Sequence, residues 1–111
     1  MRIYLPTTLE DLAAFVAAGE VPASAERYVA QDESEESEYD ALAAAADDSG
    51  EQLGGPGRRA VVVAEVADPD AAFGIDRIVA VHADASAVDP SGANLPELGW
   101  YATQEIPDLL L

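Results

Sequence analysis

The chain of 111 residues contains no cysteine, a single histidine and few aromatic side chains: one tryptophan, four tyrosines and two phenylalanines. Without cysteine it can form no disulfide, offers no thiolate nucleophile and has no sulfur ligand for zinc. Half of the residues are apolar, but many of these are alanines, which bury little area. We therefore expect a single domain over residues 1–111 that depends on one modest aliphatic core.

Positive charge is scarce as well. Five basic residues, all arginine, stand against 22 acidic residues and give a formal net charge of −17. Because proteins bind nucleic acids and anionic membranes largely through lysine and arginine, we expect no direct nucleic-acid binding and no membrane binding. No unbroken apolar run, such as residues 60–64, is nearly long enough to span a bilayer. No basic segment followed by an apolar stretch opens the sequence, so we expect no signal peptide and a cytoplasmic location.

The excess of acidic side chains has three interpretations. The first is a water-facing coat that keeps the protein soluble. The second is adaptation to a salty cytoplasm, which the absence of lysine also suits. The third is mimicry of nucleic acid, in which rows of carboxylates occupy a basic partner. We favour the water-facing coat, because mimicry requires ordered rows of charge that the sequence does not reveal.

The beginning of the chain predicts a strand followed by a helix. Residues 2–5 are rich in strand formers and end at Pro6. Thr7 and Glu10 have the spacing of a capping box, in which both side chains bond to free amides at a helix start. The helix should end at Gly19 and present one apolar stripe, which consists of Leu9, Leu12, Phe15 and Val16.

Weaker signals for a strand and a helix follow. Residues 26–30 form a short strand candidate without clean alternation. Acidic residues are concentrated in residues 32–40, as is typical of a helix start, where the helix dipole is positive. The helix should close at residues 47–50 and pack through a narrow apolar stripe, which consists of Tyr39, Leu42, Ala43 and Ala46.

The second half of the chain predicts three strands. After a glycine-rich connector, residues 60–66 are β-branched and almost continuously apolar, which is typical of a central strand covered on at least one face and favours cover on both. Residues 77–83 predict another buried strand, and residues 84–98 predict a surface loop. Residues 100–106 are the last strand candidate.

The order of these elements predicts an α+β fold. A strand–helix–strand unit usually crosses over to a parallel neighbour. We therefore expect a two-layer sandwich, in which a mixed sheet of four or five strands carries two helices on one face.

His82 is the only candidate for a catalytic base. Asp84 could orient its imidazole, or His82 could act together with Tyr101. No serine or threonine has the sequence context of a nucleophile. We favour a structural histidine at the rim of the core. The sequence contains neither a calcium loop nor the Lys-Ser/Thr ending of a phosphate loop, so it predicts no metal site and no cofactor.

The C-terminal segment is the candidate binding surface. Alternation along a strand should turn one of Trp100 and Tyr101 inward, and we favour Trp100 in the core with Tyr101 half-exposed. The alternative is a recognition surface with an outward row of Tyr101, Thr103 and Glu105. Three leucines end the chain, Leu109, Leu110 and Leu111. Left in water they would form an apolar patch, and such patches usually mark contacts.

Three stretches of the sequence carry a family resemblance. They are the opening Met-Arg-Ile-Tyr-Leu-Pro with Thr8-Leu9, the middle Glu38-Tyr39 followed by residues 58–64, and the closing Trp-Tyr-Ala-Thr-Gln-Glu-Ile at 100–106. With these stretches the chain resembles an uncharacterised family of short acidic proteins from GC-rich actinobacteria, a domain of unknown function. The family members are usually longer before the closing motif. The resemblance supports a cytoplasmic location and implies no activity, fold, cofactor or catalytic residue.

The sequence as a whole favours a noncatalytic interaction module. Its docking segment should run from Trp100 to Leu111, and its partner should be a protein, with a basic one favoured by long-range attraction, or a second copy of the chain. The rival interpretation is a small enzyme that uses His82 with Asp84 or Tyr101. A nucleic-acid mimic that binds a basic partner is the third.

Overall fold

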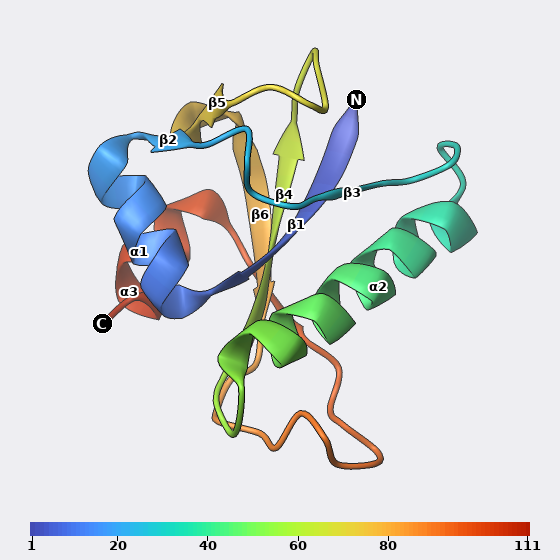
Figure 1. Cartoon of the computed structure of the whole chain (residues 1–111), viewed down its shortest axis with the longest axis vertical. Helices are drawn as coiled ribbons and strands as arrows, with labels where there is room; N and C mark the ends of the chain where they lie inside the picture. The colour runs from blue at the N-terminus through green and yellow to red at the C-terminus, as the bar shows by residue number, and fades with distance from the viewer.

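A five-stranded sheet forms the middle of the molecule (Figure 1). The computed structural model describes all residues 1–111, and the strands of this sheet lie in the order β3-β1-β4-β6-β7. They are β1 (Arg2–Thr8), β3 (Tyr28–Val29), β4 (Arg59–Glu65), β6 (Ile78–Ala83) and β7 (Gly99–Tyr101). A separate two-stranded sheet joins β2 (Glu20–Val21) to β5 (Phe73–Gly74). The predicted α+β class is confirmed.

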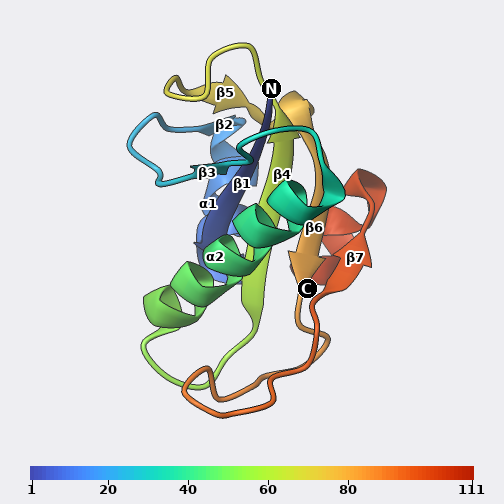
Figure 2. The ribbon, with the colours of Figure 1, turned by 90° about the vertical axis from the view of Figure 1, so that its right-hand side faces the viewer.

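The helices lie on both sides of the sheet (Figures 1 and 2). Helices α1 (Leu9–Ala18) and α3 (Ile106–Leu109) lie on one side, and α2 (Glu35–Leu53) lies on the other. Two short 3₁₀ turns complete the chain, η1 (Ile75–Arg77) and η2 (Thr103–Glu105). None of the helices is both long enough and apolar enough to traverse a bilayer.

Each face of the five-stranded sheet packs against its own apolar cluster. On the side of α1 and α3, alternate strand residues such as Ile3, Leu5 and Val62 pack with Leu12 of α1. On the other side, a smaller cluster joins β1, β4 and β6 to the alanines of α2. The expected arrangement, two layers with both helices on one face, is therefore wrong. Both faces of β4 are apolar, so each face needs a cover, and the fold has three layers.

The sheet is antiparallel throughout, so the predicted mixed sheet is also wrong. The prediction treated residues 26–30 as a full strand between two helices. β3 has only two residues, and there the chain passes from one face of the sheet to the other beside β1. Two helices therefore separate the long strands β1 and β4 (Figure 1). Because the chain runs the length of the sheet twice between them, β4 runs opposite to β1.

Helix α1 agrees with its predicted pattern except at its start. Thr8, rather than Thr7, is the N-cap, and its hydroxyl accepts a hydrogen bond from the amide of Asp11 at 3.1 Å. Thr7 is buried in β1 instead. Gly19 ends the helix with a left-handed backbone at φ 76°, a conformation that glycine adopts without steric cost. The predicted stripe does face the core: Leu12 is fully buried, and Leu9, Phe15 and Val16 pack against the same cluster.

Helix α2 contacts the sheet through smaller residues than its apolar pattern predicts. The buried positions of the helix are Ala41, Ala45, Ala46, Ser49 and Gly50. Three residues of the predicted stripe, Tyr39, Leu42 and Ala43, lie on the flank of the helix and are exposed or half-buried. The helix also continues past the predicted stop at residues 47–50 and ends at Gly54, which has φ 69°.

The predicted last strand over residues 100–106 is correct only at its beginning. β7 ends at Tyr101, and the chain then turns into η2 and α3. The carboxylate of Glu105 accepts a hydrogen bond from the amide of Ala102 at 3.1 Å and so closes this turn. Pro107, in the first turn of α3, lacks the amide that would go unpaired there. Residues 84–98 form the expected loop.

Candidate functional site

A groove lies between α2 and the loop that precedes β7. It has a volume of about 440 Å³. α2 contributes Tyr39, Leu42 and Asp47, the end of β6 contributes His82, and the loop contributes Glu97 and Leu98. Arg59 of β4 lies in the floor, where a second hollow of about 560 Å³ adjoins the groove. We call the first hollow the α2 groove.

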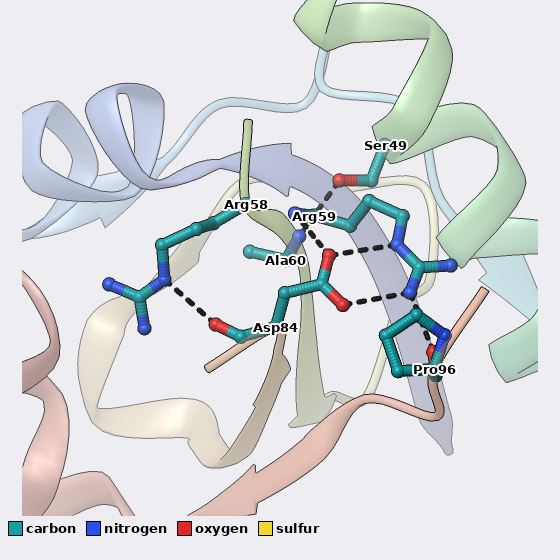
Figure 3. Close-up of polar contacts among 6 residues, drawn as sticks. All are labelled: Ser49, Arg58, Arg59, Ala60, Asp84 and Pro96. Carbon is teal, nitrogen blue, oxygen red and sulfur yellow. Dashed lines mark hydrogen bonds and ion pairs between the residues drawn. The ribbon is translucent and has the colours of Figure 1, made fainter. Parts of the chain in front are cut away.

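A buried ion pair between Arg59 and Asp84 forms one end of the groove floor (Figure 3). The Nε and Nη2 of Arg59 donate to the two carboxylate oxygens of Asp84, each at 2.8 Å. The main-chain amide of Arg59 donates to the same carboxylate at 2.9 Å. The side chains are 8% and 1% exposed, respectively. This geometry is the bidentate one that suits a guanidinium and a carboxylate.

The ion pair also fixes the loop that forms one wall of the groove. Nη2 of Arg59 donates to the carbonyl of Pro96 at 2.8 Å, and Nε of Arg58 donates to the carbonyl of Asp84 at 2.8 Å (Figure 3). Gly57 and Val88 pair as a short backbone bridge nearby. The two arginines therefore hold both ends of the loop against the sheet.

Polar side chains hold α2 on the sheet at the opposite wall. The hydroxyl of Ser49 donates to the carbonyl of Thr7 at 2.6 Å and accepts from the amide of Ala60 at 2.8 Å (Figure 3 shows the second bond). The hydroxyl of Tyr28 donates to Asp48, and this hydrogen bond raises the pKa of Tyr28 to about 12. α2 is therefore positioned by directional hydrogen bonds as well as by its small apolar contacts.

Burial of Asp84 and its pairing with Arg59 have opposite effects on the pKa of its carboxyl. Desolvation alone would raise the pKa of this carboxyl, but the hydrogen bonds and positive charge of Arg59 outweigh it and leave the pKa of Asp84 below its usual value. His82 has no such partner. Burial lowers the pKa of His82, so its imidazole is neutral at pH 7.

Trp100 and Tyr101 point to opposite faces of the sheet, as alternation predicts, and Tyr101 is half-exposed as expected. Trp100 pairs with His82, lies on the α2 side and is 61% exposed. Tyr101 pairs with Val81 and packs against the core on the side of α1 and α3. The prediction that Trp100 lies in the core is wrong. α2 packs mainly on β1 and β4, whereas β7, which carries Trp100, lies at the edge of the sheet (Figure 2).

The other residues of the predicted binding segment do not form one surface. Thr103 and Glu105 are exposed, but they belong to the turn η2 and not to an outward strand row with Tyr101. Leu109 is buried with Ile106 in the core at 5% exposure, Leu110 is half-buried and Leu111 is fully exposed. The three leucines are therefore not a patch left in water.

One comparison with known proteins places the chain. The sequence pattern of the Family of unknown function (DUF6912) matches residues 1–110. The chain belongs to this family. The predicted membership of an uncharacterised family is thus confirmed. A search of curated proteins and a search of solved structures gave no match for this DUF6912 chain.

The catalytic pairs considered from the sequence are not assembled in this DUF6912 member. The carboxylate of Asp84 is bonded to Arg59, and no hydrogen bond joins it to His82. Tyr101 lies on the face of the sheet opposite His82. No group of three or more histidine, aspartate or glutamate side chains is arranged to hold a metal ion.

Sequence reasoning missed the part played by Arg59 in this DUF6912 fold. The adjacent pair Arg58-Arg59 is visible in the sequence, and so is Asp84, but only the register of β4 against β6 brings them together. A signal was present nonetheless. Arg58 and Arg59, two of the five arginines, stand at the start of an apolar strand. When that strand is buried, their charged groups need hydrogen-bonded partners.

Proposed function

We propose that the protein is a noncatalytic interaction module that binds a protein partner through Trp100 and the α2 groove. The observation that carries the proposal is the exposure of the only tryptophan. Trp100 is 61% exposed at the edge of the sheet and lies on the same face as His82 and Leu98, which line the groove. We call the set of Trp100, Tyr39, Leu42, His82 and Leu98 the Trp100 face.

The composition of the Trp100 face is that of a contact surface. Tyr39 on the flank of α2 is 63% exposed, so two large aromatic side chains of this face are open to solvent. Tryptophan and tyrosine are enriched among the residues that contribute most binding energy at interfaces. Tyr39 and Leu42 of the predicted α2 stripe border the groove, and Leu42 also packs partly against the core. A structural role does not require these side chains to be exposed.

The free edge of β7 supports the same surface. β7 is the last strand of the sheet and pairs only with β6, so its outer edge has no backbone partner. Unpaired strand edges are sites at which proteins bind extended segments. Because β7 carries Trp100, a bound segment would contact the aromatic ring and the strand edge together.

The partner that we propose is a protein in the cytoplasm. The charge of −17 favours a basic protein through long-range attraction. A chain without cysteine needs no oxidising compartment to fold. A second copy of the chain is the alternative occupant of the Trp100 face, and the experiment below separates the two.

The test is a quantitative affinity capture from native cytoplasm with three forms of the full chain. Trp100→Ala removes the exposed ring of the Trp100 face. Val79→Ala is the matched control, because Val79 is also exposed, at 40%, but does not line the groove. We expect the wild-type chain and Val79→Ala to retain the same proteins and Trp100→Ala to lose one of them by tenfold or more, the loss that follows from an interface residue contributing about 1.4 kcal/mol.

Circular dichroism and sedimentation velocity complete this experiment. Equal unfolding midpoints for all three forms would show that the loss of binding is not a loss of fold. A concentration-dependent dimer that Trp100→Ala dissociates would assign the surface to self-association. Identical captured sets for all three forms, with no dimer, would refute the proposal.

A further inference from the structure

Resting on the proposed function, we infer that the α2 groove receives the side chain of a lysine or arginine from the partner, with Trp100 beside it. The observations are the charge balance of the groove, its apolar walls and the lack of a partner for His82. These observations concern the Trp100 face and the α2 groove, and they indicate which kind of side chain the groove would bind.

The charges in and around the groove leave it negative. Arg59 is neutralised by the bidentate pair with Asp84. His82 is neutral at pH 7, because burial lowers its pKa. Asp47 on α2 and Glu97 on the loop remain, both exposed and on opposite walls. Their carboxylates accept no hydrogen bond and form no salt bridge in the chain. The pKa of Arg59 is raised mainly by its hydrogen bonds to Asp84 and also by the nearby charge of Asp47. Because Arg59 is already paired with Asp84, the groove contains no unpaired positive charge.

The walls of the groove suit the aliphatic stem of a long basic side chain. Tyr39, Leu42 and Leu98 supply apolar surface between the two carboxylates. Lysine and arginine bury their methylene groups on such surface while the charged group stays near water and carboxylates. A cation can also lie over the ring of an exposed aromatic residue, which Tyr39 and Trp100 provide. A purely apolar side chain would leave both carboxylates unused.

His82 adds a hydrogen-bond acceptor to the groove. Its imidazole forms no hydrogen bond within the chain, and Trp100 is one of its two neighbours across the sheet, with Val61 on the other side. One nitrogen of a neutral imidazole is an acceptor, and it can receive an N–H from an ammonium or guanidinium group. The titratable and charged groups that line the groove together with His82 are Arg59 of β4, Asp47 and Tyr39 of α2, and Glu97 of the loop.

The test uses the single tryptophan as its reporter. Because Trp100 is the only tryptophan, its emission reports binding at this face without a label. The full chain is titrated with a hexa-arginine peptide, and a hexa-glutamine peptide is the neutral comparison. We expect a saturable change in Trp100 emission with the first peptide only, and a weaker affinity at high salt.

Two variants of equal charge separate groove binding from general attraction. Asp47→Asn with Glu97→Gln removes the rim carboxylates of the groove. Asp76→Asn with Asp108→Asn removes two exposed carboxylates that lie outside it and form no hydrogen bond through their side chains. We expect the first pair to weaken hexa-arginine binding about fivefold to tenfold and the second pair less than twofold, since each rim carboxylate contributes up to about 1 kcal/mol.

The failure of this inference is distinguishable from the failure of the proposed function. If both charge variants weaken the peptide equally, or if Trp100 emission does not respond, the basic side chain is not the occupant. The proposed function would still stand if Trp100→Ala abolished capture of the partner. If Trp100→Ala captures every protein that the wild-type chain does, the proposed function itself falls.

Discussion

Replacement of Asp84 by asparagine should be among the most destabilising isosteric changes in the protein. The carboxylate accepts three hydrogen bonds from Arg59, at 2.8, 2.8 and 2.9 Å, and its side chain is 1% exposed. Asparagine keeps the shape but removes the charge and turns one acceptor into an NH₂ group that faces an N–H of Arg59. Arg59 is then a buried cation without its counterion.

The magnitude follows from what breaking a buried pair costs. Removing one member of such a pair typically lowers the free energy of unfolding by about 3–5 kcal/mol. A single domain is usually stable by about 5–15 kcal/mol, so Asp84→Asn should remove a large share of the total. Arg59→Met should cost a similar amount, because it leaves the carboxylate buried and also frees the carbonyl of Pro96.

The assay is urea unfolding at pH 7, followed by far-ultraviolet circular dichroism, for both single variants and the double variant Arg59→Met with Asp84→Leu. We expect the double variant to be more stable than either single variant, since it leaves no unpaired buried charge. A loss of less than about 1 kcal/mol in Asp84→Asn, or a double variant less stable than both single variants, would refute the reasoning.

The pH dependence supplies an independent check of sign. In the wild type the pKa of Asp84 lies below its unfolded value of about 3.9, so its contribution to stability is present above that pH and is lost as the pH falls. In Arg59→Met the desolvation of Asp84 is no longer opposed by the guanidinium. The pKa of Asp84 should then lie above the unfolded value. The free energy of unfolding should therefore fall as the pH rises from the unfolded pKa to the folded pKa.

Two further predictions concern His82 and the terminal leucines. Burial lowers the pKa of His82, so the unfolded chain takes up a proton first and the wild type should lose stability as the pH falls below about 6.5; His82→Gln should lack this component, and an unchanged urea-midpoint profile would contradict it. Leu109→Ala should lower the free energy of unfolding by about 2–5 kcal/mol, whereas Leu111→Ala should leave it unchanged, because Leu109 is buried and Leu111 is fully exposed. Equal urea midpoints for the two leucine variants would show that α3 contributes no packing to the core.

The sequence predicts local elements better than their assembly. The stripe from Leu9 to Val16 and the left-handed stop at Gly19 predict α1 because both depend on neighbours within a few residues. The β-branched run of residues 60–66 predicts a central strand for the same reason. That run also favoured cover on both faces, which conflicts with two helices on a single face. In the structure both faces of β4 carry buried residues, because helices cover both faces of the sheet, and the fold therefore has three layers.

The errors near the C-terminus have a different cause. Trp100, Tyr101 and Thr103 all favour strands by intrinsic propensity, but the chain leaves the sheet after Tyr101. The turn that follows depends on the bond between Glu105 and the amide of Ala102, a local contact that strand propensity does not reveal. The face to which Trp100 points was also undetermined, because alternation gives two opposite faces and no means to choose between them.

The candidate site was the least predictable part. The sequence offers His82, two residues away, as a possible partner of Asp84, because proximity along the chain is its only guide. In the fold, the pairing of β4 with β6 brings Arg59 to Asp84 across 25 residues of chain. The α2 groove likewise needs a helix and a loop that are placed together only by tertiary packing.

The pairing of β1 with β4 bears on the order in which the protein is made. β1 opens the chain, while its central partner ends at Glu65. On the ribosome, the first strand therefore emerges long before the strand that covers its edge, and an unpaired apolar strand is a template for aggregation. The intervening residues 9–58 contain 13 acidic residues and two arginines, and six of the acidic residues lie in residues 32–40. Because chains of like charge repel one another, we expect these carboxylates to disfavour association of the chain before it has folded.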